Sequence, residues 1–163
     1  DLRWHQAIKH PSGYVGAALI GLVTHIQTNE AMSLHRTWIT PTGKAGVEPN
    51  RMLAGKHTAR HGVIRLYPDD SVTTGFGIAE GIETALSLAH EHEPVWAAIS
   101  ATNMANLPVL DGIESIVIAV DEDIAGRNAA NMLAHRWLDA NRQVTAITFE
   151  HGDANDHVEV AYA

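Results

Sequence analysis

The fold of this chain is decided by residues 116–126, which read IVIAVDEDIAG. The first five of these residues are apolar, which is typical of a strand buried on both faces of a parallel sheet. Asp121, Glu122 and Asp123 follow this strand directly, and Gly126 precedes a stretch with helical periodicity. The three acids therefore lie where a strand passes into a helix, at the sheet edge where α/β proteins bind their ligands.

A second acid occupies the equivalent place earlier in the chain. Residues 76–79 read FGIA, and Glu80 and Gly81 follow before another helical pattern begins. If the two strands are parallel neighbours, Glu80 and Asp121 converge on one edge of the sheet. Crowded carboxylates repel one another unless a cation offsets their charge, and a hard divalent cation takes oxygen ligands of this kind. Each acid alone is explained by a helix start, but the two sites together favour a metal site.

The chain divides into two parts with different patterns. Residues 1–73 predict a small β-rich subdomain, with strands at 15–26, 32–40 and 63–67, turns at 28–30 and 41–44, and an irregular stretch up to residue 55. From residue 74 the pattern alternates between strand and helix, with strands at 76–79, 95–99, 116–120 and 144–149. This alternation predicts that residues 74–163 form an α/β domain, a Rossmann-type parallel sheet of about four strands with helices on both faces.

Two helical stripes support this division. Ile82, Ala85, Leu86 and Ala89 recur at helical spacing after the first strand of the second part. A longer apolar stripe follows the third strand and consists of Ala130, Leu133, Ala134, Trp137 and Leu138. Spacing of three and four residues puts such side chains on one face of a helix.

Charge is unevenly distributed along the chain, whose net charge is −8. Residues 1–75 hold 8 Lys and Arg against 5 Asp and Glu, whereas residues 76–163 hold 3 against 14. Such asymmetry can mark contact with nucleic acid. A chance excess on a solvated surface explains the basic residues about equally well.

Composition excludes several classes of protein. The 163 residues suit one compact domain, or a domain with a small appendage. With no cysteine in the sequence, disulfides and Cys-based zinc sites are ruled out, and no apolar run reaches the length of a membrane-spanning helix. The spacing of the 11 histidines matches no metal motif. Because the chain begins with Asp1, we expect it to be a piece of a longer protein.

The two acidic segments together resemble the Toprim domain, which topoisomerases, DnaG-type primases and some nucleases share. Its two signatures are a Glu-Gly pair, here in IAEG at residues 78–81, and a DxDxxG segment, here in IAVDEDIAG at residues 118–126. The resemblance covers residues 74 to 158. The preceding basic stretch is similar to the small β-rich subdomain of primases from phages, plasmids and other mobile elements.

The resemblance implies a cytoplasmic DNA primase that makes RNA primers on single-stranded DNA by metal-dependent nucleotidyl transfer. The implied catalytic residues are Glu80, Asp121 and Asp123. The implied ligands of Mg²⁺ or Mn²⁺ are Glu80, Asp121, Asp123 and Asp153. Phosphates of the template or of nucleoside triphosphates are expected at Arg36, Lys44, Arg51 and Lys56. The glycines expected to let the backbone turn or a phosphate approach are Gly81 and Gly126.

Further partners and roles also follow from the resemblance. A replicative helicase, or a helicase domain in the parent chain, is an expected partner, and a membrane is not. Independently of the resemblance, the polar residues around Asn155 favour a turn that caps a C-terminal helix. A lack of primase activity in the isolated piece is compatible with this interpretation, because its partners in the parent chain would be missing.

Three alternatives remain open at this stage. A Toprim nuclease would carry the same acids but cut rather than join nucleotides. A receiver domain also places acids at strand ends and binds Mg²⁺, although it lacks the Glu-Gly pair. A nucleic-acid-binding or scaffold domain without activity is the third, against which the presence of Glu80, Asp121 and Asp123 counts.

Overall fold

The computed structural model describes residues 2–55, 60–149 and 157–162, the last of these as backbone only. We call residues 1–73 the front half and residues 74–163 the back half. The described elements of the front half are β1 (Leu2–Lys9), β2 (Val15–His25), β3 (Ala31–Thr40), β4 (Gly43–Lys44), β5 (Arg51–Leu53), β6 (Gly62–Arg65) and the 3-10 helix η1 (Asp69–Ser71). Those of the back half are β7 (Gly75–Ala79), α1 (Ile82–Leu88), β8 (Val95–Ala97), α2 (Ala101–Asn106), β9 (Ser115–Val120), α3 (Ile124–Asp139), β10 (Gln143–Phe149) and β11 (His157–Tyr162).

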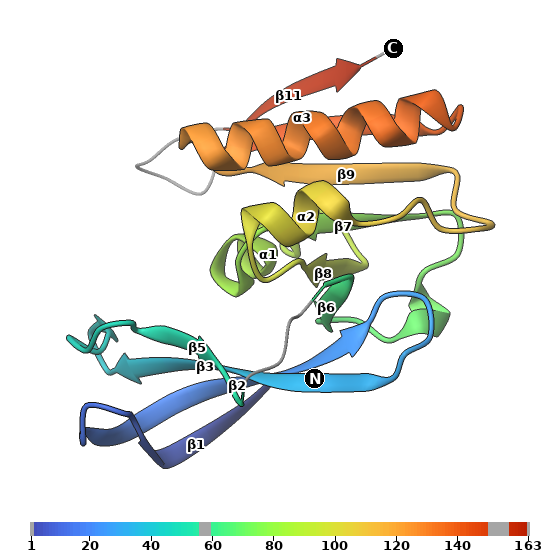
Figure 1. Cartoon of the computed structure of the whole chain (residues 1–163). Coiled ribbons are helices and arrows are strands. Elements are labelled where there is room, and N and C mark those ends of the chain that lie inside the picture. The colour runs from blue at the N-terminus through green and yellow to red at the C-terminus, as the bar shows by residue number, and fades with distance from the viewer. Residues whose placement is uncertain (1, 56–59, 150–156, 163) are drawn as a thin grey trace.

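One mixed sheet runs through both halves (Figure 1). Its strand order is β11-β10-β9-β7-β8-β6-β2-β3-β4, with β1 paired to β2 and β5 paired to β3. The strands β10, β9, β7 and β8 are mutually parallel, which confirms the predicted parallel sheet of about four strands. The strand β6 pairs antiparallel with both β8 and β2, so it joins the front half to the back half.

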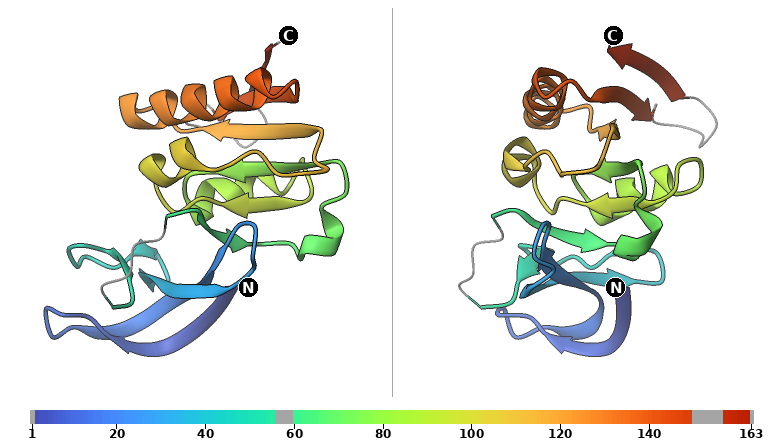
Figure 2. Two further views of the ribbon diagram at one scale, coloured as in Figure 1. Left: turned by 45° about the vertical axis from the view of Figure 1, so that its right-hand side comes forward. Right: turned by 90° about the vertical axis from the view of Figure 1, so that its right-hand side faces the viewer.

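Helices cover both faces of the parallel strands, as predicted (Figure 2). On one face, α2 and α3 pack on Phe76, Ile78 and Ile116 through an apolar stripe that includes Leu133 and Trp137. This α3 stripe is the one expected from the sequence. On the other face, α1 packs on β7, β8 and β9 through its buried residues Ile82, Ala85 and Leu88.

The apolar face of α1 differs in one position from the predicted stripe. Leu86 is exposed, and Leu88 is fully buried in its place. Because α1 has only 7 residues, a stripe three or four residues apart is defined by few positions, and tertiary packing selects among them.

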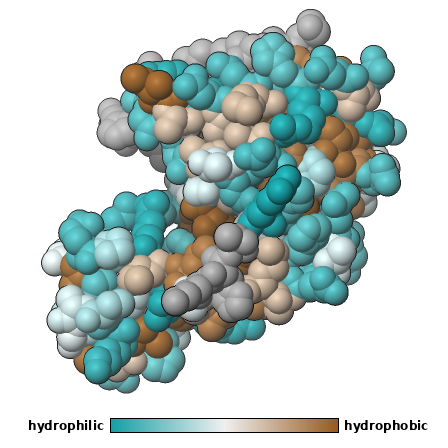
Figure 3. Space-filling view, viewed as in Figure 1, coloured by the Kyte–Doolittle hydropathy of each residue, from teal (hydrophilic) through white to brown (hydrophobic). Residues whose placement is uncertain are grey.

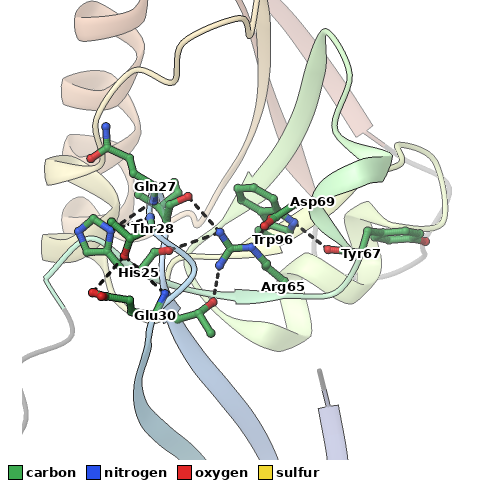
Figure 4. Close-up of polar contacts among 10 residues, drawn as sticks. His25, Gln27, Thr28, Glu30, Arg65, Tyr67, Asp69 and Trp96 are labelled. Carbon is green, nitrogen blue, oxygen red and sulfur yellow. Dashed lines mark hydrogen bonds and ion pairs between the residues drawn. The ribbon is translucent and has the colours of Figure 1, made fainter.

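A buried arginine, Arg65, lies at the junction of β2, β6 and β8, where its hydrogen bonds stay within the front half and its contact with the Trp96 ring reaches the back half (Figure 4). Arg65 on β6 donates to Thr24 Oγ1 and, at 3.0 Å, to the carbonyl oxygen of Ile26. Its guanidinium also pairs with Asp69 and lies 4.6 Å from the centre of the Trp96 ring. A buried cation of this kind is tolerated because hydrogen bonds and an opposite charge surround it.

Four of the described strands were not predicted as strands. The strand β1 was not predicted because its pairing leaves nearly all its side chains exposed, so it shows no apolar alternation. The expected irregular stretch contains β5, and the expected turn at 41–44 includes β4; both are held by pairing with β3. The expected C-terminal helix is wrong, because residues 157–162 form β11 on the edge of β10. None of the helices in the described ranges is long and apolar enough to cross a membrane.

Candidate functional site

Two acids leave the sheet side by side at the carboxyl ends of neighbouring strands. The strands β7 and β9 pair in parallel, with Ala79 opposite Ala119. Glu80 directly follows β7 and Asp121 directly follows β9. The neighbouring arrangement on which the sequence argument depended is therefore present.

The charges at this edge are close enough to influence one another. Burial raises the pKa of Glu80 above its ordinary value, and the negative charges of Asp121 and Asp123 raise it further. The backbone N–H of Ala101, which donates to the Glu80 carboxylate, and the charge of Arg51 partly offset the rise in this pKa. Burial and neighbouring negative charges both disfavour the ionised form of a carboxyl group, and both act on Glu80.

Asp121 is fixed by its neighbours on both sides. Thr84 on α1 donates its hydroxyl proton to Asp121 Oδ1 at 3.1 Å. At the other side the first turn of α3 approaches so closely that a Cβ on Gly126 would lie 2.8 Å from Asp121 Cβ and from the Asp121 carbonyl oxygen. The glycine is therefore needed for this close approach, which is one of the two reasons anticipated for it.

Asp123 belongs to the group of acids at this edge and also caps a helix. Its Oδ1 accepts a hydrogen bond of 2.7 Å from the backbone N–H of Gly126, which caps α3. Asp121, Glu122, Asp123 and Glu83 all line one pocket of about 630 Å³, which we call the acidic pocket. Glu80 is not among the residues that line this pocket, although its pKa responds to the charges of Asp121 and Asp123.

The described residues contain no group of three His, Asp or Glu side chains gathered closely enough to hold a metal ion by themselves. Asp153, the remaining predicted ligand, lies outside the described residues. The edge offers carboxylate oxygens from Glu80, Asp121 and Asp123. Such a set suits Mg²⁺, which binds through one or two carboxylates and completes its shell with water and substrate oxygens.

Two of the predicted phosphate-binding residues reach this edge from the front half. Lys44 on β4 and Arg51 on β5 form ion pairs with Glu83 on α1, at 3.6 Å and 2.9 Å. Burial alone would raise the pKa of Glu83, but the hydrogen bond from its own N–H and the charges of Arg51 and Lys44 outweigh burial and lower it. The two cations are thus held beside the acidic pocket.

Glu83 was not singled out from the sequence. The signal that could have found it is its spacing from Glu80. A side chain three residues further along a helical turn lies close to the first one, at the same end of the helix. Thr84 was missed for a different reason. A threonine in a helical stretch shows its role only when its hydrogen-bond partner is known.

The remaining predicted residues show no contact with the acids of this edge among the described residues. Arg36 donates to the Leu53 carbonyl oxygen at 3.3 Å, and its guanidinium lies 5.3 Å from the centre of the Trp38 ring, within the front half. A Cβ on Gly81 would meet its nearest neighbours at 3.6 Å or more, so no close approach requires this glycine. Lys56 lies outside the described residues.

Comparison with known families divides the chain between two models. The model of the Toprim domain matches residues 76–161, and a domain of unknown function (DUF7146) matches residues 1–66. No curated protein matches the chain.

Three solved structures share the fold over 91% of this chain. A DNA primase domain from Pseudomonas aeruginosa has a TM-score of 0.55, 15% identity and 50% of its own length covered. The Aquifex aeolicus primase, with its zinc-binding and RNA polymerase domains, has a TM-score of 0.53 and 14% identity, and 39% of its length is covered. The primase fragment of the bacteriophage T7 primase-helicase protein has a TM-score of 0.56 and 19% identity, and 59% of its length is covered. The chain thus spans about half the length of the solved structures it matches.

These comparisons agree with the parallel sheet. The chain has a primase-type core fold. Because the Toprim model covers more than half of the 163 residues, the chain belongs to the Toprim domain family.

Proposed function

We propose that this chain is the catalytic core of a DNA primase, which makes RNA primers on single-stranded DNA by metal-dependent nucleotidyl transfer. The observation that carries the proposal is the meeting of Glu80 and Asp121 at the ends of β7 and β9, with the charge of Asp121 raising the pKa of Glu80. The primase-type core fold supports the same function.

A divalent cation, Mg²⁺ or Mn²⁺, would be held by Glu80, Asp121 and Asp123, with Asp153 as a further ligand. The donor set fits, since all are carboxylates and their mutual repulsion is relieved by a cation. When bound, such an ion neutralises phosphate charge and aligns the attacking and leaving oxygens of a nucleotidyl transfer.

The residues of the chain supply positioning. Thr84 orients the Asp121 carboxylate, and the Ala101 N–H orients that of Glu80. Asp123 uses one oxygen to cap α3, which leaves its second oxygen for the site. Holding reacting groups in one geometry is the main contribution that a protein makes to phosphoryl transfer.

Phosphates of the template strand or of nucleoside triphosphates would bind to Lys44 and Arg51, and to Arg36 and Lys56. Lys44 and Arg51 are already gathered beside the acidic pocket by Glu83. An incoming phosphate would compete with Glu83 for both cations, because it offers them a stronger anion.

Partners and setting follow from the same proposal. The T7 relative is a fragment of a primase-helicase protein, and we propose a replicative helicase or helicase domain as partner here too. A primase of a phage, plasmid or other mobile element would act in the cytoplasm, where its template is replicated.

A primer-synthesis assay tests the proposal. The chain is incubated with single-stranded DNA, labelled nucleoside triphosphates and Mg²⁺, alone and with a partner helicase. We expect Asp121→Asn to lower primer synthesis by about a hundredfold or more, on the scale of a lost electrostatic contribution to catalysis. Asp111→Asn, an exposed acid away from the edge, is the control.

The same preparations are tested for nicking of supercoiled DNA, which separates a primase from a Toprim nuclease. Primer synthesis that depends on Asp121 supports the proposal. Nicking without primer synthesis, or full activity of Asp121→Asn, contradicts it.

A further inference from the structure

The turn between β8 and α2 passes the end of β7, where Glu80 leaves the sheet. At the start of this turn, the N–H of Ala98 donates to the Ala79 carbonyl oxygen at 2.8 Å. At its end, the N–H of Ala101 donates to the Glu80 carboxylate. The course of the turn therefore sets where this carboxylate lies.

The backbone of this turn is strained. Ile99 has φ of 78°, a conformation that is a genuine outlier for a β-branched residue. On one side the turn borders open space, because Ile99 and Ser100 line a pocket of about 810 Å³ between the front half and α2. Figure 3 shows the molecule hollowed there, between the lower lobe and the body above it. Strained backbone persists only where the surrounding structure holds it, so the turn needs a firm attachment.

The side chain of Asn103 on α2 supplies that attachment. It is 8% exposed and makes three hydrogen bonds through its amide. Its Nδ2 donates to the carbonyl oxygens of Ala98 at 2.7 Å and of Gly62 at 2.6 Å. Its Oδ1 accepts from the backbone N–H of His61 at 2.8 Å. A single amide thus joins α2 to the end of β8 and to the start of β6.

The same amide also holds strained backbone on the side of the front half. His61 has φ of 60°, so it shares with Ile99 a positive φ in a residue other than glycine. Ile99 directly follows Ala98, and each strained residue therefore lies next to, or at, a backbone group that binds Asn103. Removing the amide would leave buried backbone groups unpaired at two places where the chain can relax to an ordinary conformation.

We propose that Asn103 is a positioning residue for Glu80, because its amide holds the strained turn in the place where the Ala101 N–H meets the Glu80 carboxylate. The front half thereby contributes, through His61 and Gly62, to the geometry of an acid in the back half. An effect of Asn103 on metal binding rests on the proposed function. The placement of the carboxylate does not depend on that function.

The first test needs no metal and uses the whole chain, labelled with a nitrogen isotope, in EDTA. Nuclear magnetic resonance follows the amide proton of Ala101. Hydrogen bonds to a charged carboxylate are stronger than those to a neutral amide, so Glu80→Gln should move this signal upfield in the parent chain. We expect the response to residue 80 to be largely lost in Asn103→Ala. It should persist in the control Asn106→Ala, an exposed residue of α2 whose amide donates to a carbonyl oxygen of its own helix.

The second test measures Mn²⁺ affinity by electron paramagnetic resonance. We expect Asn103→Ala to weaken binding about tenfold, the lower end of the range for losing a group that orients a metal ligand. Ala101→Pro removes the N–H itself, at the first position of α2 and after the extended Ser100, where proline is compatible with the helix. It should cause a similar loss. The two changes combined should cost no more than either alone, since both act through one hydrogen bond.

Thermal melting separates this role from a purely structural one. Asn103→Ala should melt below the parent chain, because it leaves buried backbone groups unpaired. If it does not fold, Asn103→Ser, which keeps one hydrogen-bonding group, replaces it. A lower melting temperature with unchanged Mn²⁺ affinity and an Ala101 signal that still responds to residue 80 would overturn the proposal, since Asn103 would then only stabilise the fold.

The two proposals can fail separately. An Ala101 signal that depends on Glu80 through Asn103, in a chain that binds no Mn²⁺, supports the positioning role and contradicts the proposed function. Mn²⁺ binding that requires Asp121 but is unchanged in Asn103→Ala and in Ala101→Pro supports the metal site and overturns the positioning role.

Discussion

Gly126 controls how closely α3 approaches Asp121. Gly126→Ala places a methyl group 2.8 Å from Asp121 Cβ and from a backbone oxygen, neither of which can rotate away. We expect a loss of about 1–3 kcal/mol in the free energy of unfolding, as for other overpacked sites. Urea denaturation measures it. Gly46→Ala, where an added Cβ meets nothing within 4 Å, is the control, and equal effects at the two glycines would contradict this account.

Glu83 gives the edge a pH-dependent ion-pair network. Its pKa lies below the usual 4.5 because the folded state favours the charged carboxylate. It therefore contributes stability above pH 4.5, and this contribution is lost as the pH falls through the lowered pKa. We expect Glu83→Gln to cost about 0.5–1 kcal/mol at pH 7, since the pairs are half exposed, and progressively less toward pH 3.

Chemical denaturation of both proteins between pH 3 and 7 measures this difference. Glu114→Gln, at the opposite end of β9, is the matched control. A cost at position 83 that stays constant over the whole range would mean that the carboxylate charge has no part in it.

The residues of the site were predictable to different degrees. Glu80 and Asp121 were predictable because each follows a buried strand, and the ends of parallel strands share an edge. The role of Thr84 was not, because a hydroxyl at a half-buried helical position is consistent with many partners. Nor was the role of Asn103, because its partners Gly62 and His61 lie 41 and 42 residues earlier in the chain.

At the scale of elements, Arg65 holds β2, β6 and β8 at the junction of the halves. Arg65→Met keeps the length of the side chain but removes the hydrogen bonds to Thr24 and to the Ile26 carbonyl oxygen, and the pair with Asp69. We expect the free energy of unfolding to fall by roughly 2 kcal/mol or more, because hydrogen bonds to charged groups are worth about 1.5–3 kcal/mol each.

Thermal and urea denaturation test this prediction against Arg3→Met on the exposed strand β1. A cost at Arg65 no larger than that at Arg3 would show that the junction does not depend on the buried cation.

Most elements of the back half were predictable because they are buried on one or both faces. Their apolar residues therefore recur at the spacing of a strand or a helix. The strands β7 and β9 read as apolar runs, and α3 shows its stripe. The strands β1, β4 and β5 carry little such signal, because they are short or exposed and are held by hydrogen bonds to a neighbouring strand. That β11 is a strand follows from the free edge of β10, which the local sequence does not reveal.

At the scale of the whole molecule, the basic front half meets the acidic back half through Lys44 and Arg51. Replacing both with Ala should weaken binding of single-stranded DNA with little dependence on sequence. We expect the slope of log affinity against log salt to become shallower by about 1.4, since each phosphate of a single strand that a cation neutralises adds about 0.7 to the slope. Fluorescence anisotropy over a series of salt concentrations measures the slope.

Replacement of Arg3 and Lys9 on β1 changes the net charge equally and serves as the control for this prediction. An equal change in slope for the two pairs would mean that overall charge, and not the position beside the acidic pocket, sets the affinity.

The central claim is that acids from separate segments bind a shared divalent cation at the carboxyl ends of β7 and β9. Its most direct test is a crystal of the chain soaked in Mn²⁺, with the ion located by its anomalous scattering. The account predicts a peak bound by the carboxylates of Glu80 and Asp121, and its absence from crystals of Asp121→Asn. A saturating soak that leaves this edge empty, or an ion bound only by residues elsewhere, would contradict the account.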